Sequence, residues 1–313
     1  MLGWGSWANT QKLSDRDAWP FPLFYWDYAV GVFLFSLVIA LTLGLGGEFG
    51  AFANLAQAGR APILHALVGG VLFNIANLLL VVAIDAAGLS VAFPVGIGLA
   101  LVIGTVVNYF QTPKGNPLLI ALGVAFILLA MILSARAHRK LRGKDPSMGV
   151  RGLVFAIIAG CLMGLFYPQL MRSISAGFNT GVIQPGQLSP YAALLIFSVG
   201  VLASNIFVNT IFMRANGIGY GRYFSGRAKV HLWGLLGGMI WMFALTCNVI
   251  ASGVAGPAIS YALGQGATLV AALWGVFVWR EFRDAPAGTW PYVVLMLASY
   301  SVGLGLIGLA TFS

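Results

Sequence analysis

The chain has 313 residues, a length that would ordinarily suggest two soluble domains. Only 8% of its residues are charged and 59% are hydrophobic, whereas about 25% of the residues of a soluble domain are charged. A soluble globule of this size would lack the polar residues needed to cover its surface. The composition therefore excludes a soluble protein and predicts an all-α, polytopic membrane protein surrounded by lipid.

The net charge of +9 does not indicate nucleic-acid binding, because no basic cluster alternates with aromatic residues. Cys161 and Cys247 both lie in apolar runs, at a spacing that fits neither a disulfide framework nor a metal site. The sequence contains no His-Glu-x-x-His, no Gly-x-Ser-x-Gly and no Cys/His cluster. We therefore expect no enzymatic activity, no metal and no cofactor.

Apolar stretches of about 20 residues between charged positions predict membrane-spanning helices. The first eleven residues, MLGWGSWANTQ, are apolar and aromatic but too short to cross a membrane. We expect them to be the inner end of a first helix whose outer half is missing from this chain. Nine complete spans follow in chain order: 28–47, 62–84, 89–109, 117–135, 152–171, 191–213, two between 229 and 280 that divide at Ala251–Pro257, and 290–312.

The basic residues predict the orientation, since cytoplasmic connections of membrane proteins are enriched in Lys and Arg. The connections on one side carry 14 of the 17 basic residues, namely Lys12, Arg16, the six of segment 136–151, Arg214, Arg222, Arg227, Lys229, Arg280 and Arg283. The opposite connections carry only Arg60, Lys114 and Arg172. We expect a cytoplasmic linker at 136–151 and a C-terminus outside the cell.

Short patterns recur in the same order in the two parts of the chain, 163 to 174 positions apart. Val91-Ala-Phe-Pro94 matches Val254-Ala-Gly-Pro257, His65 and Gly69-Gly70 match His231 and Gly237-Gly238, and Pro117 matches Pro291. Because each half holds five spans, an odd number, the halves must have opposite orientations. The sequence predicts an inverted repeat with residues 1–135 and 152–313 as its halves, the usual construction of secondary transporters with a binding site near the membrane midplane.

Several short motifs also resemble a known family. They are Leu2-Gly-Trp-Gly-Ser-Trp7, Tyr25-Trp-Asp-Tyr28, Gly46-Gly-Glu-Phe-Gly50, Gly88-Leu-Ser-Val91, Ile103-Gly-Thr-Val-Val-Asn-Tyr-Phe110 and Leu273-Trp-Gly-Val-Phe-Val-Trp-Arg-Glu-Phe-Arg283. In these motifs the chain resembles the drug/metabolite transporter superfamily, closest to the ureide permeases and their bacterial relatives, near the glucose/ribose porters. The resemblance implies ten helices in two inverted five-helix repeats, a bacterial inner-membrane location and proton-coupled uptake. The linker lacks the Walker-A-like sequence of the plant ureide permeases, so nothing indicates ATP binding.

Carboxylates offer few candidates for carrying a proton. Asp27 and Asp85 are expected at inner helix ends, and only Glu48 is expected to face a cavity, near the outer end of the second span. A carboxylate at the midplane, the usual proton carrier of a pump, is not apparent. The residues alone therefore permit facilitated diffusion as well as proton coupling, with Glu48 as the proton-coupling candidate or, alternatively, an interfacial capping group.

Neutral amides and aromatic rings are the candidate substrate ligands. Amides supply both donors and acceptors, and indole and phenol rings stack on flat heterocycles or sugar faces. A buried amide must be paired in hydrocarbon, so each one either joins helices or lines a polar cavity. The candidates are Trp4, Trp7, Asn74, Asn77, Asn108, Tyr109, Asn205, Asn209, Tyr261, Gln265 and Trp274.

Together these features predict a secondary active transporter that moves a small neutral polar metabolite, such as a ureide or nucleobase, by alternating access. The alternatives are a sugar porter of the glucose/ribose type and an exporter of metabolites or drugs. An intramembrane enzyme is disfavoured because no span carries a nucleophile–base pair or a set of metal ligands. The sequence indicates neither the substrate itself nor the oligomeric state.

Overall fold

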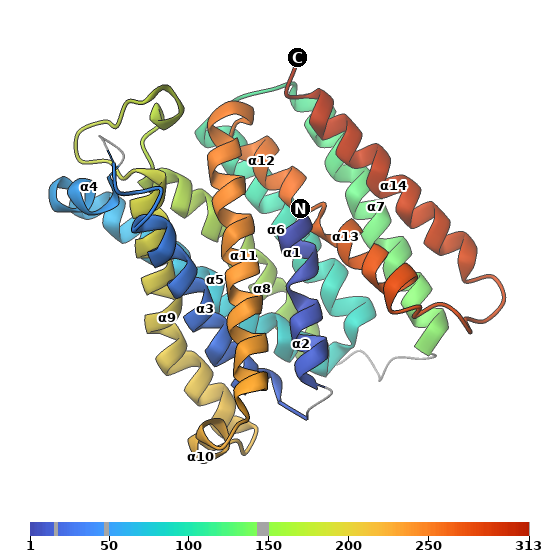
Figure 1. Ribbon diagram of the computed structural model, residues 1–313. Helices are drawn as coiled ribbons and strands as arrows, with labels where there is room; N and C mark the ends of the chain where they lie inside the picture. The colour runs from blue at the N-terminus through green and yellow to red at the C-terminus, as the bar shows by residue number, and fades with distance from the viewer. Residues whose placement is uncertain (16–17, 47–49, 143–149, 313) are drawn as a thin grey trace. The chain divides into compact units, whose positions relative to one another are not determined.

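The computed structural model describes residues 1–15, 18–46, 50–142 and 150–312. These residues form helices joined by turns and short loops, with no β-strand in the described segments (Figure 1). In the described residues, nine helical stretches are long and apolar enough to cross a membrane, and one of them, Pro257–Val278, consists of α12, α13 and η3 together. The prediction of an all-α, polytopic membrane protein is therefore confirmed.

The helices, in chain order, are α1 (Leu2–Ser6), α2 (Ala8–Asp15), α3 (Phe21–Ala40), α4 (Ala51–Gln57), α5 (Arg60–Ala87), α6 (Leu89–Gln111), α7 (Pro117–Arg142), α8 (Val150–Ser173), η2 (Phe178–Thr180), α9 (Pro190–Ala215), α10 (Tyr220–Phe224), α11 (Ala228–Ala255), α12 (Pro257–Gly264), α13 (Ala267–Leu273), the π-helical η3 (Trp274–Val278) and α14 (Trp290–Leu309). Eight of the nine predicted spans overlap the observed helices closely. The N-terminal segment, expected as one helix end, forms the two short helices α1 and α2.

The second span lies seven residues earlier than the charges suggest. The sequence predicts residues 28–47, whereas α3 covers Phe21–Ala40. Pro20 in extended conformation and Pro22 in the first turn set its start, where the missing proline N–H costs nothing. Asp27 therefore lies inside the helix rather than at its end, and two hydrogen-bonded partners make this tolerable, as described below.

The chain folds into two compact units. Unit 1 comprises Met1–Gly5, Leu79–Pro168 and Ala255–Ser313, and unit 2 comprises Ser6–Leu78 and Gln169–Val254. Each unit contains segments from both halves of the proposed repeat, and the boundaries fall inside α5 and α8. The repeat itself stays a prediction.

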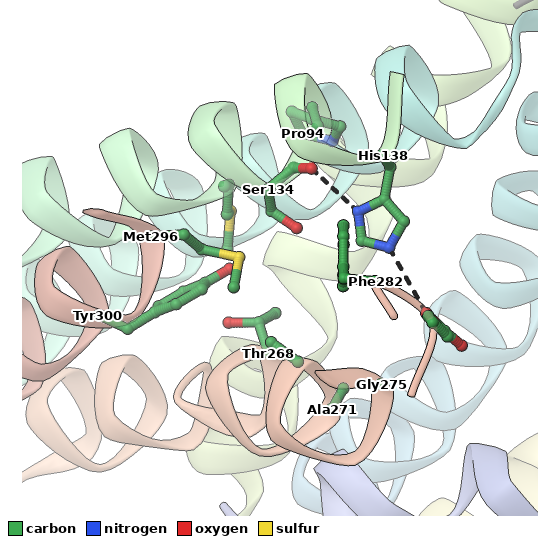
Figure 2. Close-up of a pocket in the computed structure, with 13 residues that line it drawn as sticks. Pro94, Ser134, His138, Thr268, Ala271, Gly275, Phe282, Met296 and Tyr300 are labelled. Atoms are coloured by element: carbon green, nitrogen blue, oxygen red, sulfur yellow. Dashed lines mark hydrogen bonds and ion pairs between the residues drawn. The ribbon is translucent and has the colours of Figure 1, made fainter. Parts of the chain in front are cut away.

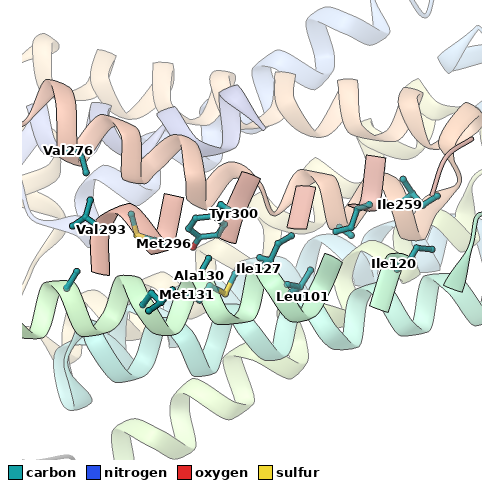
Figure 3. Close-up of a cluster of buried hydrophobic side chains, with 14 of the residues drawn as sticks. Leu101, Ile120, Ile127, Ala130, Met131, Ile259, Val276, Val293, Met296 and Tyr300 are labelled. Atoms are coloured by element: carbon teal, nitrogen blue, oxygen red, sulfur yellow. The ribbon is translucent and has the colours of Figure 1, made fainter. Parts of the chain in front are cut away.

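The core of unit 1 lies where α7 runs beside α14, against α6 and α12 (Figure 3). Two glycines bring α7 and α14 together, because a Cβ added to Gly123 would lie 2.7 Å from the carbonyl oxygen of Gly303. Around this contact, apolar side chains interdigitate: Leu101, Ile120, Ile127, Met131, Met296 and Tyr300 are 5% exposed or less. Burial of these side chains stabilises the unit.

Unit 2 is built around α3, which packs against α9 and α11. A Cβ on Gly238 of α11 would overlap the Tyr28 carbonyl oxygen, so these two backbones touch. On its other side, α3 is joined to α9 by a buried hydrogen bond of 2.6 Å between the hydroxyls of Ser36 and Ser198. Small residues thus allow the close helix approach that is typical of membrane bundles.

Asn54 of α4 forms hydrogen bonds to the segment before α9. We expect its replacement by alanine to lower the free energy of unfolding. Its amide nitrogen donates to the Gln187 carbonyl at 2.9 Å, and its oxygen accepts from the Ser189 N–H at 2.8 Å. Asn54→Ala leaves both backbone groups without this partner, which typically costs about 1–3 kcal/mol. The variant should melt at a lower temperature in detergent than the wild type. An unchanged melting temperature would mean that water replaces both bonds.

Candidate functional site

Helices α5 and α9 of unit 2 start together and run in the same direction. Just before α5, the N–H of Gly59 donates to the carbonyl of Gly186, which lies four residues before α9, at 2.7 Å. The helices then cross at Gly70 and Gly200, where an added Cβ would overlap the carbonyl oxygens of Phe197 and Leu67, respectively. Residues one turn beyond these glycines therefore lie at the same depth.

Asn74 and Asn205 occupy those positions, one turn beyond the crossing. Both side chains are fully buried. Neither the side-chain nitrogen nor the side-chain oxygen of either residue has a hydrogen-bond partner among the described residues. Because an unpaired buried amide costs free energy and such groups are few in native proteins, these two require an explanation.

Helix α3 brings two tyrosines to the same depth. It runs antiparallel to α9, since Asn209 donates to the Pro22 carbonyl at 2.9 Å whereas Ser198, earlier in α9, meets Ser36 later in α3. Asn205 therefore faces the stretch of α3 that holds Tyr25 and Tyr28. Asn77 of α5 approaches the Tyr25 hydroxyl without hydrogen-bond geometry, and the buried Tyr28 hydroxyl has no partner in the described segments.

Further aromatic rings pack around the two tyrosines. Tyr25 and Tyr28 stack with ring centroids 5.2 Å apart. Trp7 lies 5.0 Å and Trp241 6.4 Å from the Tyr28 ring. Phe73, next to Asn74, packs 4.1 Å from Trp241. We call Trp7, Tyr25, Tyr28, Asn74, Asn77, Asn205 and Trp241 the amide–aromatic cluster. It combines donors, acceptors and flat rings, which are the groups that recognise a small planar polar solute.

The other predicted ligands belong to unit 1, except for Asn209. Tyr261 is fully buried and donates to the Ala100 carbonyl at 3.2 Å. Asn108 donates to the Gly104 carbonyl of its own helix at 2.7 Å, which leaves its oxygen unpaired in the described structure. Trp4, Tyr109 and Trp274 are half-buried. Since Asn74 and Asn77 belong to unit 2, a common site with Gln265 stays a prediction.

Gln265 occupies a break in the ninth span. The helix α12 ends at Gly264, a turn covers Gln265 and Gly266, and α13 begins at Ala267. Thr268 donates its hydroxyl to the Gln265 carbonyl at 2.8 Å and so caps the freed backbone. Discontinuous helices of this kind form the substrate and ion sites of many transporters, so Gln265 remains a candidate ligand.

A cavity of about 170 Å³ lies beside that break, within unit 1 (Figure 2). Met131 and Ser134 of α7, Thr268 of α13, and Met296 and Tyr300 of α14 are among its lining residues. At one end, the His138 imidazole lies 3.8 Å from the Glu281 carboxylate and also contacts the Ser134 carbonyl at 2.9 Å. A cavity of this size holds one small ring, but its walls are largely apolar.

Two outcomes concern the carboxylates. Glu48, the predicted proton-coupling residue, lies outside the described residues.

Asp27, expected at a helix end, is instead 3% exposed within α3. The Tyr223 hydroxyl donates to its carboxylate at 2.6 Å, and the His231 imidazole lies 3.0 Å from both of its oxygens. Sequence reasoning missed this group because its partners lie about 200 positions away.

Comparisons with known proteins decide the family. A sequence profile described as "Ureide permease" matches residues 24–146 and 136–310. The chain belongs to the ureide permease family. This family consists of transporters, so the chain is a membrane permease for small metabolites and not an enzyme.

Individual relatives agree with this assignment. Ureide permease 1 of Arabidopsis thaliana is 23% identical over 98% of this chain and 94% of its own length. Ureide permease 2 of the same plant is 24% identical, over 95% and 91%. An Enterococcus faecalis protein named for sugar uptake is 21% identical over 82% and 79%. A solved crystal structure shares the fold, with a TM-score of 0.63 and 16% identity over 98% of this chain and 94% of its own.

Proposed function

We propose that this ureide permease moves a small, uncharged, planar metabolite rich in N–H and C=O groups, a ureide or a nucleobase, by alternating access. The observation that carries the proposal is the pair of fully buried amides Asn74 and Asn205, which have no hydrogen-bond partner among the described residues and lie at the depth of the stacked rings of Tyr25 and Tyr28. The relatives named ureide permeases support the same substrate class.

The chemistry of the amide–aromatic cluster favours a ureide over a charged solute. Each asparagine offers two donors and one acceptor, and the Tyr28 hydroxyl can serve as either. A ureide presents matching carbonyl and N–H groups on a flat ring, which could stack on Tyr25 or Tyr28. An uncharged ligand needs no counter-charge, and it would satisfy the amides that otherwise stay unpaired.

The test is uptake by the purified protein in proteoliposomes. The panel contains allantoin, uracil, xanthine, glucose and ribose. We expect counterflow of allantoin or a nucleobase, meaning that internal unlabelled solute drives the entry of labelled solute. Counterflow of glucose or ribose alone would replace the ureide proposal by the sugar-porter alternative, which the Enterococcus faecalis relative favours. Efflux of a solute in the absence of counterflow would favour the other alternative, an exporter of metabolites or drugs.

We also propose that the fold is the ten-helix drug/metabolite transporter fold built from two inverted repeats. Backbone features at corresponding positions support this. Gly88 and Gly256, 168 positions apart, precede α6 and α12 with φ values of 78° and 88°. Gly115 and Gly288, before α7 and α14, have φ values of 80° and 78°. All four lie in the region that favours glycine, which supports a correspondence between these positions in the two proposed halves.

The proposed orientation, in a bacterial inner membrane, has the 136–151 linker inside and the C-terminus outside. It rests on the distribution of basic residues. Ser147→Cys, in a variant whose two native cysteines are replaced by serine, should react with an impermeant maleimide only after the cells are permeabilised. Labelling of intact cells would reverse the orientation.

A further inference from the structure

A cluster of titratable groups surrounds Asp27 near the first turns of α3. Asp27 accepts a hydrogen bond of 2.6 Å from the Tyr223 hydroxyl and lies 3.0 Å from Nδ1 of His231. The imidazole is held between two rings, with centroids 5.2 Å from Trp19 and 4.9 Å from Tyr223. Three separate segments of unit 2 therefore fix one carboxylate–imidazole pair.

The two members of this pair differ in how far the surrounding protein covers them. The Asp27 side chain is 5% exposed, whereas that of His231 is 23% exposed. On the buried side, Gly234 of α11 lies directly against Asp27, because a Cβ there would overlap the aspartate Cβ. A proton can thus reach the pair through the imidazole, while the carboxylate stays shielded.

We propose that Asp27 and His231 share the proton that this permease exchanges with the solution during transport. The inference rests on the proposed function and adds proton coupling to it, because it assigns the coupled proton to two residues. It differs from the sequence-based expectation, in which Glu48 has this role.

The reason is electrostatic. With one shared proton, as Asp27 carboxylate and His231 imidazolium, the pair has no net charge. Removal of that proton leaves one negative charge within a membrane helix, which is expensive unless water reaches it. Release of the proton is therefore favoured only when this end of unit 2 opens to solvent, and rebinding favours closure. The proton moves between water and a nitrogen or oxygen atom, and no other bond changes.

The position of the pair links it to the amide–aromatic cluster. Asp27 directly precedes Tyr28 in α3, and both residues contact α11: Asp27 at His231 and Gly234, and the Tyr28 backbone at Gly238. Separation of α3 from α11 at this end would break the pair and displace Tyr28 in the same movement. Protonation and access to the cluster are thereby coupled.

In the part of the chain that the structure describes, His231 is the ion-pair partner of the Asp27 carboxylate. Tyr223 on α10 and His231 on α11 are the titratable groups that contact it. Burial and the adjacent carboxylate raise the pKa of Tyr223, so its hydroxyl stays protonated and donates. The guanidinium of Arg222 donates to the Ala18 carbonyl instead. The other basic residues of the surrounding elements are Lys12 on α2, Arg214 on α9, Arg227 before α11 and Lys229 in its first turn.

The first half of the proposed repeat provides a matched control. His65, the counterpart of His231, also forms a hydrogen bond to another helix, at 2.8 Å, but its partner is the neutral amide of Gln169. Only the second half thus places a carboxylate opposite this histidine in the described structure. Asp85, which is exposed near the end of α5, is the corresponding control for the carboxylate.

The experiment compares two assays of one preparation in proteoliposomes, with allantoin as solute. In the first, labelled allantoin exchanges with internal allantoin at equal pH on both sides. In the second, an acidic exterior drives its accumulation. Wild type should perform both. Asp27→Asn and His231→Gln should lose accumulation at least tenfold while exchange falls less than about fivefold. His65→Gln and Asp85→Asn should retain both.

Tyr223→Phe keeps the pair and removes one hydrogen bond to the charged carboxylate. The Tyr223 donor draws off part of the negative charge of the carboxylate, which is ionised with or without the shared proton. Without this donor, the carboxylate should hold the proton on the imidazole more strongly, so the pair should release it at higher pH. We expect the midpoint of pH-driven accumulation to rise by about one pH unit. This variant keeps the proposal testable even if Asp27→Asn fails to fold, because a purely structural ion pair would change the melting temperature and not the midpoint.

The outcomes separate this inference from the proposed function. If wild type exchanges no member of the ureide and nucleobase panel, the proposed function fails. If wild type exchanges allantoin but ignores the pH gradient, or if Asp27→Asn still accumulates it, the proton assignment is overturned and the permease function stands. An unshifted midpoint in Tyr223→Phe would also overturn the assignment.

Discussion

Asn74→Ala should weaken substrate binding by roughly five- to 150-fold, which corresponds to the loss of about 1–3 kcal/mol when a hydrogen-bonding group of the solute is left unpaired. The same variant should be as stable as the wild type or slightly more stable. In the absence of substrate, neither side-chain atom of Asn74 has a partner in the described structure, so its removal leaves no other group unsatisfied. Equilibrium binding of allantoin and a melting curve, measured on one preparation, test both parts.

Asn54→Ala is the matched control for that experiment. Both residues are buried asparagines of unit 2, but Asn54 has both of its bonds to protein backbone. It should therefore lose stability and keep affinity, the opposite of Asn74→Ala. If Asn74→Ala binds normally and melts earlier, the amide joins helices and does not bind the substrate. Gln265→Ala, measured in the same way, tests whether the ninth span contributes to the site.

The second large effect is expected where two helices touch. Gly238→Ala would place a Cβ on top of the Tyr28 carbonyl oxygen and 2.7 Å from the Val32 nitrogen. Both are backbone atoms, so α3 and α11 must separate along their length. We expect a loss of about 3 kcal/mol or more and a reduced yield of folded protein, measured by thermal unfolding and by size-exclusion chromatography in detergent.

Gly305→Ala in α14 is the control for the glycine experiment. It is also a glycine within a membrane helix, but an added Cβ there would meet no atom within 4 Å. The intrinsic preference of alanine for the helix is the same at both positions, so the difference between the two variants isolates the effect of the close approach. Equal stability of the two variants would show that α3 and α11 can move apart at little cost.

Sequence reasoning recovers the long helices because their signal is local. A run of about 20 apolar residues bounded by charges predicts a span wherever it occurs, and α5, α9 and α14 match their predicted ranges to within a few residues. The prediction is wrong at α3 because it assumes that a carboxylate ends a helix. Asp27 is compensated by His231 and Tyr223, and no local pattern reveals such distant partners.

The sequence predicts only some residues of the amide–aromatic cluster. Asn74, Asn77, Asn205 and Trp7 are candidates from the sequence because an amide or an indole is conspicuous in an apolar run. Tyr25, Tyr28 and Trp241 are not, although the Tyr25-Trp-Asp-Tyr28 motif contributes to the family resemblance. Aromatic residues are frequent at membrane interfaces, so composition alone cannot separate a ligand-facing ring from an interfacial one.

The break at Gln265 and Gly266 divides the ninth span into two pieces that contact different helices. The Tyr261 hydroxyl holds α12 to the backbone of α6, whereas Thr268 and Gly275 of the following pieces line the cavity beside α7 and α14. A continuous helix would transmit a tilt along its whole length, but two pieces joined by a turn can tilt separately. Spectroscopic labels at Ala258 and Ala271 would consequently record different movements within one span during a transport cycle.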